Sequence, residues 1–177
     1  MATNISTESV FELIEQSRKC KSKAGFYAND LGGDFANSIL NEFKRRFIDY
    51  DARAKIYADK SLECEARAIE LVAKIGLSEE DYDNLVEAYF EEAPENPMTL
   101  SQKSYEYLIK GADLINLSED SNPDNKEEVL AKNIRKEVSD FYIGKAEDYG
   151  NKVNDAISKQ FESVGYSKQE REGLRKF

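Results

Sequence analysis

The feature that most constrains the fold is a row of apolar and small residues that recur at alternating spacings of four and three. Between residues 36 and 75 this row continues without one Gly or Pro. Such a heptad repeat predicts a long helix, about 60 Å at 1.5 Å per residue, packed along a neighbouring helix. We expect it over residues 34–75, with Asp34 as N-cap and Gly76 as terminator. The seam consists of Ala36, Leu40, Phe43, Phe47, Tyr50, Ala54, Tyr57, Ser61, Cys64, Ala68, Leu71 and Ile75.

A second long helix is predicted over residues 123–164, because apolar residues again recur with helical spacing. Asn122 is placed to cap it, Pro123 suits its first position, and Gly165 suits its end. Its apolar face consists of Leu130, Ile134, Val138, Phe141, Tyr142, Ala146, Tyr149, Val153, Ala156, Ile157, Phe161 and Val164.

Shorter helices are predicted over 7–21, 78–92 and 99–115, and after Ser167. Capping patterns mark their starts: Ser9-x-x-Glu12 or Ser6, Ser78-x-x-Asp81, Thr99-x-x-Gln102 and Ser167-x-x-Glu170. Residues 22–33 break the first pattern and end in Gly32-Gly33. The helix over 99–115 has a predicted core face of Tyr105, Leu108, Ile109, Ala112 and Ile115.

These patterns predict an all-α fold in a single helical domain, residues 1–177. We expect an elongated bundle in which the helices over 34–75 and 123–164, each of about forty residues, pack lengthwise in coiled-coil fashion. Three or four shorter helices complete it, the first of them covering part of the heptad seam. No segment alternates apolar and polar residues between turn signals, so we predict no sheet.

Histidine is absent from the 177 residues, which excludes Ser-His-Asp and Cys-His catalytic groups and histidine-ligated zinc or haem. The two cysteines, Cys20 and Cys64, fall on different predicted helices and form no C-x-x-C pair. We expect small, reduced residues at helix contacts and no cofactor or metal. No signal peptide or apolar run of about 18 residues is present, so we expect a soluble cytoplasmic protein that does not bind membranes.

The net charge of −10 is concentrated in residues 78–128, which hold fifteen acidic and three basic residues. This stretch is interpreted either as a solvated face or as a docking surface for a basic partner. Direct nucleic-acid binding is disfavoured because phosphates are repelled. The basic clusters Arg18-Lys19-x-Lys21-x-Lys23 and Lys44-Arg45-Arg46 are short and balanced by nearby acids. The candidate partner-binding residues are Glu79, Glu80, Asp83, Glu87, Glu91, Glu92 and Glu95.

The function predicted from these observations is a non-enzymatic protein-interaction module, an adaptor or inhibitor that acts through the acidic helical face. An inhibitor of a nucleic-acid-binding enzyme, of phage or mobile-element type, would suit this character. The alternative is an assembly protein that forms homo-oligomers through the heptad seam. Third, Glu12-x-x-Glu15 and Glu137-x-x-Asp140 resemble the carboxylate pairs that hold Mg²⁺ in all-α nucleotide pyrophosphatases. Their separation along this chain is far longer than in that family.

Overall fold

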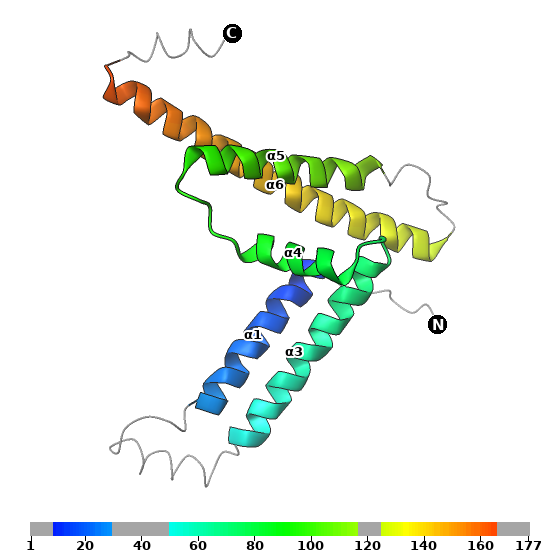
Figure 1. The fold of residues 1–177 in the computed structure, drawn as a ribbon. Coiled ribbons are helices and arrows are strands. Elements are labelled where there is room, and N and C mark those ends of the chain that lie inside the picture. The colour runs from blue at the N-terminus through cyan, green and yellow to red at the C-terminus, as the bar shows by residue number, and fades with distance from the viewer. Residues whose placement is uncertain (1–8, 30–49, 117–124, 166–177) are drawn as a thin grey trace, which may run out of the picture. The chain divides into compact units, whose positions relative to one another are not determined.

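The computed structural model describes residues 9–29, 50–116 and 125–165, and these ranges contain helices and no strand (Figure 1). The predicted all-α class is therefore confirmed for the described residues. The chain divides into two compact units, residues 1–86 and 87–177, which are considered separately below. The prediction of one domain over 1–177 stays a prediction. The helices are α1 (Val10–Asn29), α3 (Tyr50–Ala73), α4 (Glu79–Phe90), α5 (Pro97–Asn116) and α6 (Lys126–Ser163).

In the first unit, α1 packs along α3 (Figure 1). The two helices come close where small residues meet: the hydroxyl oxygens of Ser17 and Ser61 lie 3.0 Å apart, and Ser61 also donates to the Ser17 carbonyl at 3.0 Å. Apolar side chains on the facing sides exclude water from this contact and supply its hydrophobic stabilisation. The buried residues of these two helices are Val10, Leu13, Ile14 and Ser17 of α1, and Ser61, Ala68, Leu71 and Val72 of α3.

The prediction of two helices of about forty residues is corrected. Only α6, with 38 residues, approaches that length, whereas the described helix α3 has 24. The seam residues before Tyr50, and the predicted Asp34 cap, lie outside the described residues. Within the first unit α3 packs lengthwise on α1, and within the second unit α6 packs lengthwise on α5; the predicted pairing of 34–75 with 123–164 stays a prediction. No helix in the described ranges combines the length and apolarity needed to cross a membrane.

Helix α1 is longer than predicted, since it continues past Lys21 to Asn29. Its start is as expected: the Ser9 hydroxyl accepts from the Glu12 backbone N–H at 3.3 Å. The additional turns make contacts with α3, where the ring of Tyr27 stacks on that of Tyr57 with centroids 5.6 Å apart. These tertiary contacts outweigh the low helix propensity of Gly25, and the helix continues through a stretch that breaks the apolar pattern.

The junction between α3 and α4 follows the predicted capping chemistry. Gly76 adopts φ +83°, and the bonds from Gly76 N–H to the Ala73 carbonyl (3.0 Å) and from Leu77 N–H to the Val72 carbonyl (3.2 Å) form a Schellman motif. Ser78 then caps α4. Its hydroxyl accepts from Asp81 N–H at 3.1 Å, and the Asp81 carboxylate accepts from Ser78 N–H at 2.9 Å. This confirms the predicted capping box.

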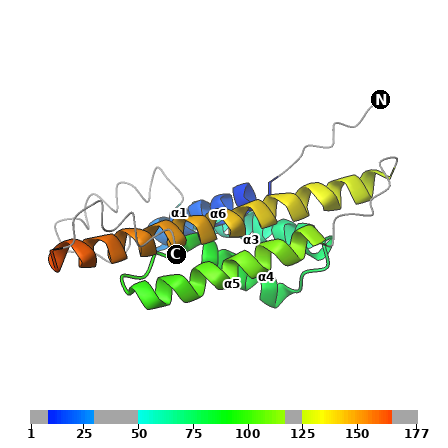
Figure 2. The ribbon, with the colours of Figure 1, turned by 90° about the horizontal axis from the view of Figure 1, so that it is seen from above.

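In the second unit, α5 and α6 lie side by side in both views (Figures 1 and 2). Two hydroxyl-to-carbonyl hydrogen bonds connect them, from Ser104 to Ala146 at 2.7 Å and from Ser139 to Gly111 at 2.8 Å. Both bonds require close backbones, and Gly111 permits this: a Cβ there would lie 2.7 Å from Cγ1 of Ile143. The buried core of the pair includes Leu100, Tyr107 and Leu114 of α5, and Ile134, Val138, Tyr142 and Tyr149 of α6.

Three predictions for this unit are corrected. Helix α5 is capped by Asn96, whose side-chain oxygen accepts from Met98 N–H at 2.8 Å, and not by Thr99. Helix α6 starts at Lys126 behind Asn125 as N-cap, and not behind Asn122. The face of α5 predicted as core is largely exposed, because Leu100, Tyr107, Gly111 and Leu114 are buried in its place. The predicted end of α6 is confirmed by Gly165 at φ +86°; the predicted helix after Ser167 lies outside the described residues.

Candidate protein-docking surface

The seven predicted partner-binding acids lie on α4 and on the segment that follows it. Glu79, Glu80, Asp83 and Glu87 belong to α4, and Glu91, Glu92 and Glu95 come before α5. Helix α4 directs its apolar residues inward: Tyr82, Leu85 and Ala88, spaced at three residues, are buried. The four acids of α4 occupy the remaining faces and are exposed. Acids in the first turn also stabilise the helix, since they face the positive end of its dipole.

Six of the seven acids form what we call the acidic surface: Glu79, Glu80, Asp83, Glu87, Glu92 and Glu95. All six are exposed, and none has a Lys or Arg ion-pair partner within the described ranges. The negative charge of this surface is therefore balanced by solvent ions or by a bound partner.

Glu91 differs from the other six because its side chain is only 19% exposed. Its carboxylate accepts from the Tyr107 hydroxyl at 2.6 Å and from the Tyr149 hydroxyl at 3.2 Å, and it pairs with the Lys103 ammonium. Its backbone carbonyl accepts from Lys145 Nζ at 3.0 Å. Glu91 thus fastens the segment after α4 to both α5 and α6, so its charge is used within the chain.

Burial sets the protonation of the groups around Glu91. It raises the pKa of Tyr107 to about 12, with a further contribution from Tyr149 nearby, and it also raises the pKa of Tyr149. Burial lowers the pKa of Lys145, helped by the like charge of Lys152. Phenols keep their protons at neutral pH even at the ordinary pKa, and both can donate to the Glu91 carboxylate; the raised pKa values extend this to more alkaline pH.

Aromatic residues near the acidic surface belong mainly to the core. Tyr82 is buried, and burial followed by the charge of Glu65 raises its pKa to about 12. Tyr89 and Phe90 are half-buried with ring centroids 4.9 Å apart, and Tyr89 also lies 5.8 Å from the ring of Phe141. These rings hold α4 in place more than they offer anchors to a partner.

The two alternative functions would use a carboxylate metal site and the heptad seam. In the described residues, no three Cys, Asp or Glu side chains converge as a metal site would require, and Glu15 pairs with Lys19 at 2.7 Å. The heptad seam, as far as it is described, faces α1 within the same chain: Ser61 bonds to Ser17, and Ala68 is fully buried. A second copy could therefore not use that part of the seam without displacing α1.

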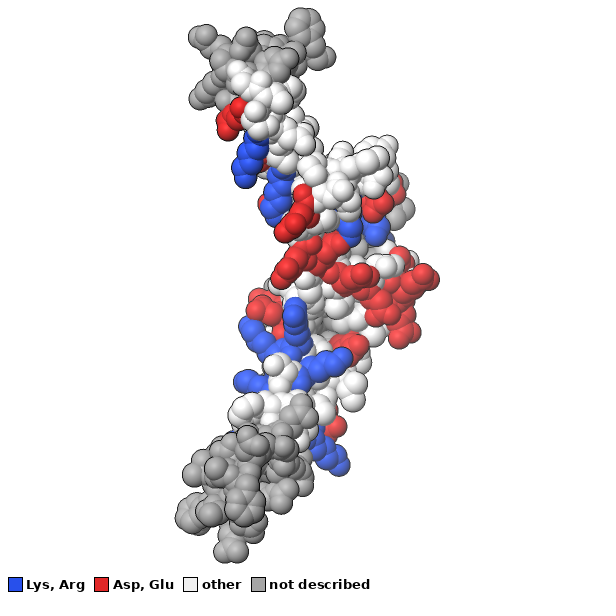
Figure 3. All heavy atoms as spheres, turned by 60° about the vertical axis from the view of Figure 1, so that its left-hand side comes forward, with Lys and Arg blue, Asp and Glu red and all other residues white. Residues whose placement is uncertain are grey.

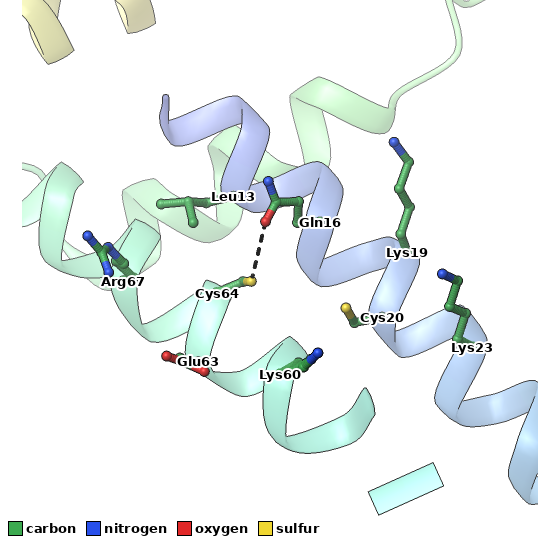
Figure 4. Close-up of a pocket in the computed structure, with 9 residues that line it drawn as sticks. All are labelled: Leu13, Gln16, Lys19, Cys20, Lys23, Lys60, Glu63, Cys64 and Arg67. Carbon is green, nitrogen blue, oxygen red and sulfur yellow. Dashed lines mark hydrogen bonds between the residues drawn. The ribbon is translucent and has the colours of Figure 1, made fainter. Parts of the chain in front are cut away.

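Two features were missed in the sequence. The first is an exposed apolar face on α5, where the side chains of Met98 and Tyr105 are 72% and 65% exposed and Leu108, Ile109 and Ile115 are also exposed. The helical spacing of these residues is evident in the sequence, but such spacing predicts a buried face. The second is a groove between α1 and α3 that gathers basic residues and both cysteines (Figure 4). No local signal could reveal it, because its two walls are about forty residues apart in the sequence.

Comparison with known proteins adds no relative to this description: no family model, no curated protein and no solved structure matches the chain.

Proposed function

We propose that this chain is a non-enzymatic protein-interaction module, an adaptor or inhibitor, which docks a partner protein with a basic surface. The observation that carries the proposal is the acidic surface: six exposed carboxylates without a cationic partner in the described ranges. Like charges this close in sequence repel one another, and a basic partner would relieve the repulsion. Complementary charge would also speed the encounter and reject acidic competitors.

The helix that carries four of the six acids is locally well defined, which favours binding over simple solvation. Tyr82, Leu85 and Ala88 on it are buried, and the capping box fixes its first turn. Glu91 fixes the segment that carries Glu92. Acids on an ordered helix lose less conformational entropy on binding than acids on a flexible segment, so more of the interaction energy appears as affinity.

The partner that best suits a rigid acidic surface is a nucleic-acid-binding protein inside the cell, whose basic groove normally holds phosphates. The chain would then act as an inhibitor that occupies the groove, and a phage or mobile-element origin would suit this role. Nucleic acid itself is not the expected ligand, because this surface repels phosphates.

The exposed face of α5 supports the same proposal independently of charge. Large apolar side chains at neighbouring helical positions form the kind of patch that marks protein-interaction sites, and polar residues around such patches give specificity.

The test is a charge reversal of the acidic surface. We expect Glu80→Lys, Glu87→Lys and Glu92→Lys together to weaken partner affinity about tenfold or more, because the reversed charges repel a basic surface. The matched control reverses three exposed acids of α6, Asp140, Glu147 and Asp155, and should retain capture. Partners are captured from a lysate of the source organism, identified by mass spectrometry, purified and titrated.

Circular dichroism checks that both variants remain helical. Duplex DNA should compete with the chain if the captured partner uses a nucleic-acid groove. Equal affinity of the charge-reversed and control variants for the purified partner, with helicity intact, would contradict the proposal.

A further inference from the structure

A groove of about 450 Å³ lies between α1 and α3, entirely within the first unit (Figure 4). Its volume is in the range of small-molecule sites, which span about 300–1,000 Å³. Residues from both helices line it: Leu13, Gln16, Lys19, Cys20 and Lys23 of α1, and Lys60, Glu63, Cys64 and Arg67 of α3.

The groove is basic in a chain whose net charge is −10. Lys19 and Lys23, one turn apart, line its α1 wall, and Lys60 and Arg67 line its α3 wall, against the single acid Glu63. Basic side chains gather on this pair of helices also in the surface view (Figure 3). An anion in the groove would therefore meet cations from two sides.

Lys19 and Lys23 are held by neighbours on the same pair of helices. Lys19 pairs with Glu15 at 2.7 Å, and the ammonium of Lys23 lies 5.3 Å from the centre of the Tyr57 ring. The cation–π contact restrains the Lys23 side chain and, unlike an ion pair, brings no opposite charge beside it. The side chains of Lys19 and Lys23 are therefore partly held in position before any ligand binds.

The remaining lining is small and not aromatic. Leu13 and the two thiols contribute apolar surface, and the Cys64 thiol donates to Gln16 Oε1 at 4.0 Å. Among the described residues that line the groove none is aromatic, so none of them would stack on a nucleobase. The lining suits a compact ligand with several negative charges in a row.

We propose that the α1–α3 groove binds linked phosphates: inorganic pyrophosphate or tripolyphosphate, or the phosphate chain of a nucleotide. The Arg67 guanidinium suits phosphate oxygens because it can donate two parallel hydrogen bonds, and the three lysines add point charges on both walls. Linked phosphates reach cations on two helices at once, whereas a single phosphate would contact fewer of them. This site is independent of the acidic surface.

The cysteines offer a direct readout, since Cys20 and Cys64 are the only two in the chain and both line the groove. N-ethylmaleimide, which is uncharged, reports how accessible they are. Pyrophosphate, tripolyphosphate and ATP should slow its reaction saturably at constant ionic strength, and sulfate should not. Equal protection by ATP and tripolyphosphate assigns the site to the phosphate chain of nucleotides. Protection by the inorganic compounds alone assigns it to inorganic polyphosphate.

Matched variants locate the binding. Lys23→Gln with Lys60→Gln removes one cation from each wall and should raise the dissociation constant for tripolyphosphate about tenfold or more, as charge-assisted hydrogen bonds are lost. Lys21→Gln with Lys55→Gln makes the same charge change on exposed positions outside the groove and should alter it less than about twofold. If the first pair does not fold, Lys60→Gln alone, on an exposed side chain, is used.

Three results would overturn the proposal: no saturable protection by any linked phosphate, equal effects of the two variant pairs, or protection by an acidic peptide such as oligoglutamate without protection by tripolyphosphate.

Discussion

Glu91 and Glu92 are neighbouring acids with the same chemistry and opposite environments. Glu92 is exposed, whereas the Glu91 carboxylate receives hydrogen bonds from Tyr107 and Tyr149 and an ion pair from Lys103. Removing Glu91 would leave these donors without their acceptor, and unsatisfied buried groups are costly. Of these two adjacent residues, Glu91 therefore contributes to stability, and Glu92 belongs to the surface proposed for docking.

We predict that Glu91→Ala lowers the free energy of unfolding by roughly 2–4 kcal/mol. Glu92→Ala is the matched control and should change it by less than about 0.5 kcal/mol. Urea unfolding followed by circular dichroism measures both. Equal destabilisation by the two substitutions would show that the Glu91 contacts do not hold the second unit together.

Two glycines of the α5–α6 pair should respond to alanine with opposite signs. At Gly111 a Cβ would meet Ile143 Cγ1 at 2.7 Å and the Ser139 carbonyl at 3.2 Å, so Gly111→Ala should destabilise by about 1–3 kcal/mol. At Gly144 an added Cβ would meet no atom of another described element within 4 Å, and Gly144→Ala should stabilise α6 by up to about 1 kcal/mol. Thermal unfolding gives the signs, and a Gly111→Ala protein as stable as the wild type would refute the close approach.

At the scale of elements, substitutions at the N-terminus of α5 test which residue caps the helix. Asn96→Ala should cost about 1 kcal/mol, because the Met98 and Thr99 backbone N–H groups lose their acceptor. Thr99→Ala, at the cap expected from sequence, should change stability by less than about 0.5 kcal/mol. Chemical denaturation of the two variants decides the matter, and a larger loss for Thr99→Ala would restore the original prediction.

Local capping could be predicted from sequence, whereas helix partners could not. The motifs at Gly76 and Ser78 involve residues at most five positions apart, so the relevant atoms are already close in the sequence. The heptad seam shows that α3 has a partner but not which one. The contact between Ser17 and Ser61 joins residues 44 positions apart, and nothing in either neighbourhood marks them as a pair.

The same limit explains the reversed face of α5. Its sequence offers two apolar stripes, and spacing alone does not say which one is buried. The buried stripe is the one that contains Gly111, because the missing side chain of Gly111 allows contact with Ser139 and Ile143 on α6. For the candidate site, exposure of six acids followed from their charge. The inward role of Glu91 did not, because Tyr107 and Tyr149 are 16 and 58 residues away.

At the scale of the whole molecule, each unit carries a tyrosine whose pKa burial raises to about 12: Tyr82 in the first and Tyr107 in the second. The ordinary value is 10.0, so the unfolded chain loses these protons at lower pH than the folded chain. The stability linked to them is complete below pH 10 and is lost as the pH rises towards 12.

We therefore predict that the free energy of unfolding falls between pH 10 and pH 12, and that Tyr82→Phe with Tyr107→Phe makes this fall shallower. Tyr105→Phe, at an exposed position, is the control and should leave the slope unchanged. Absorbance at about 295 nm follows phenol ionisation in parallel. A slope that is the same in all three proteins would contradict the assignment.

The two charged regions assign different partners to different parts of one chain. The acidic surface of α4 and the segment after it is proposed for a basic protein, and the groove between α1 and α3 for linked phosphates. Because the exposed acids lie on α4 and the segment after it, and the groove lysines lie on α1 and α3, substitutions in one region should leave binding at the other intact. Each proposal can therefore fail without the other.

Hydrogen–deuterium exchange of the chain with its purified partner tests the docking proposal most directly. We predict that the partner slows exchange in peptides covering Glu79–Phe90 and residues 91–96, and that this protection is lost when Glu80, Glu87 and Glu92 are reversed to Lys. Protection confined to α1, α3 or α6, with exchange in α4 unchanged, would contradict the proposal that the acidic surface docks a protein.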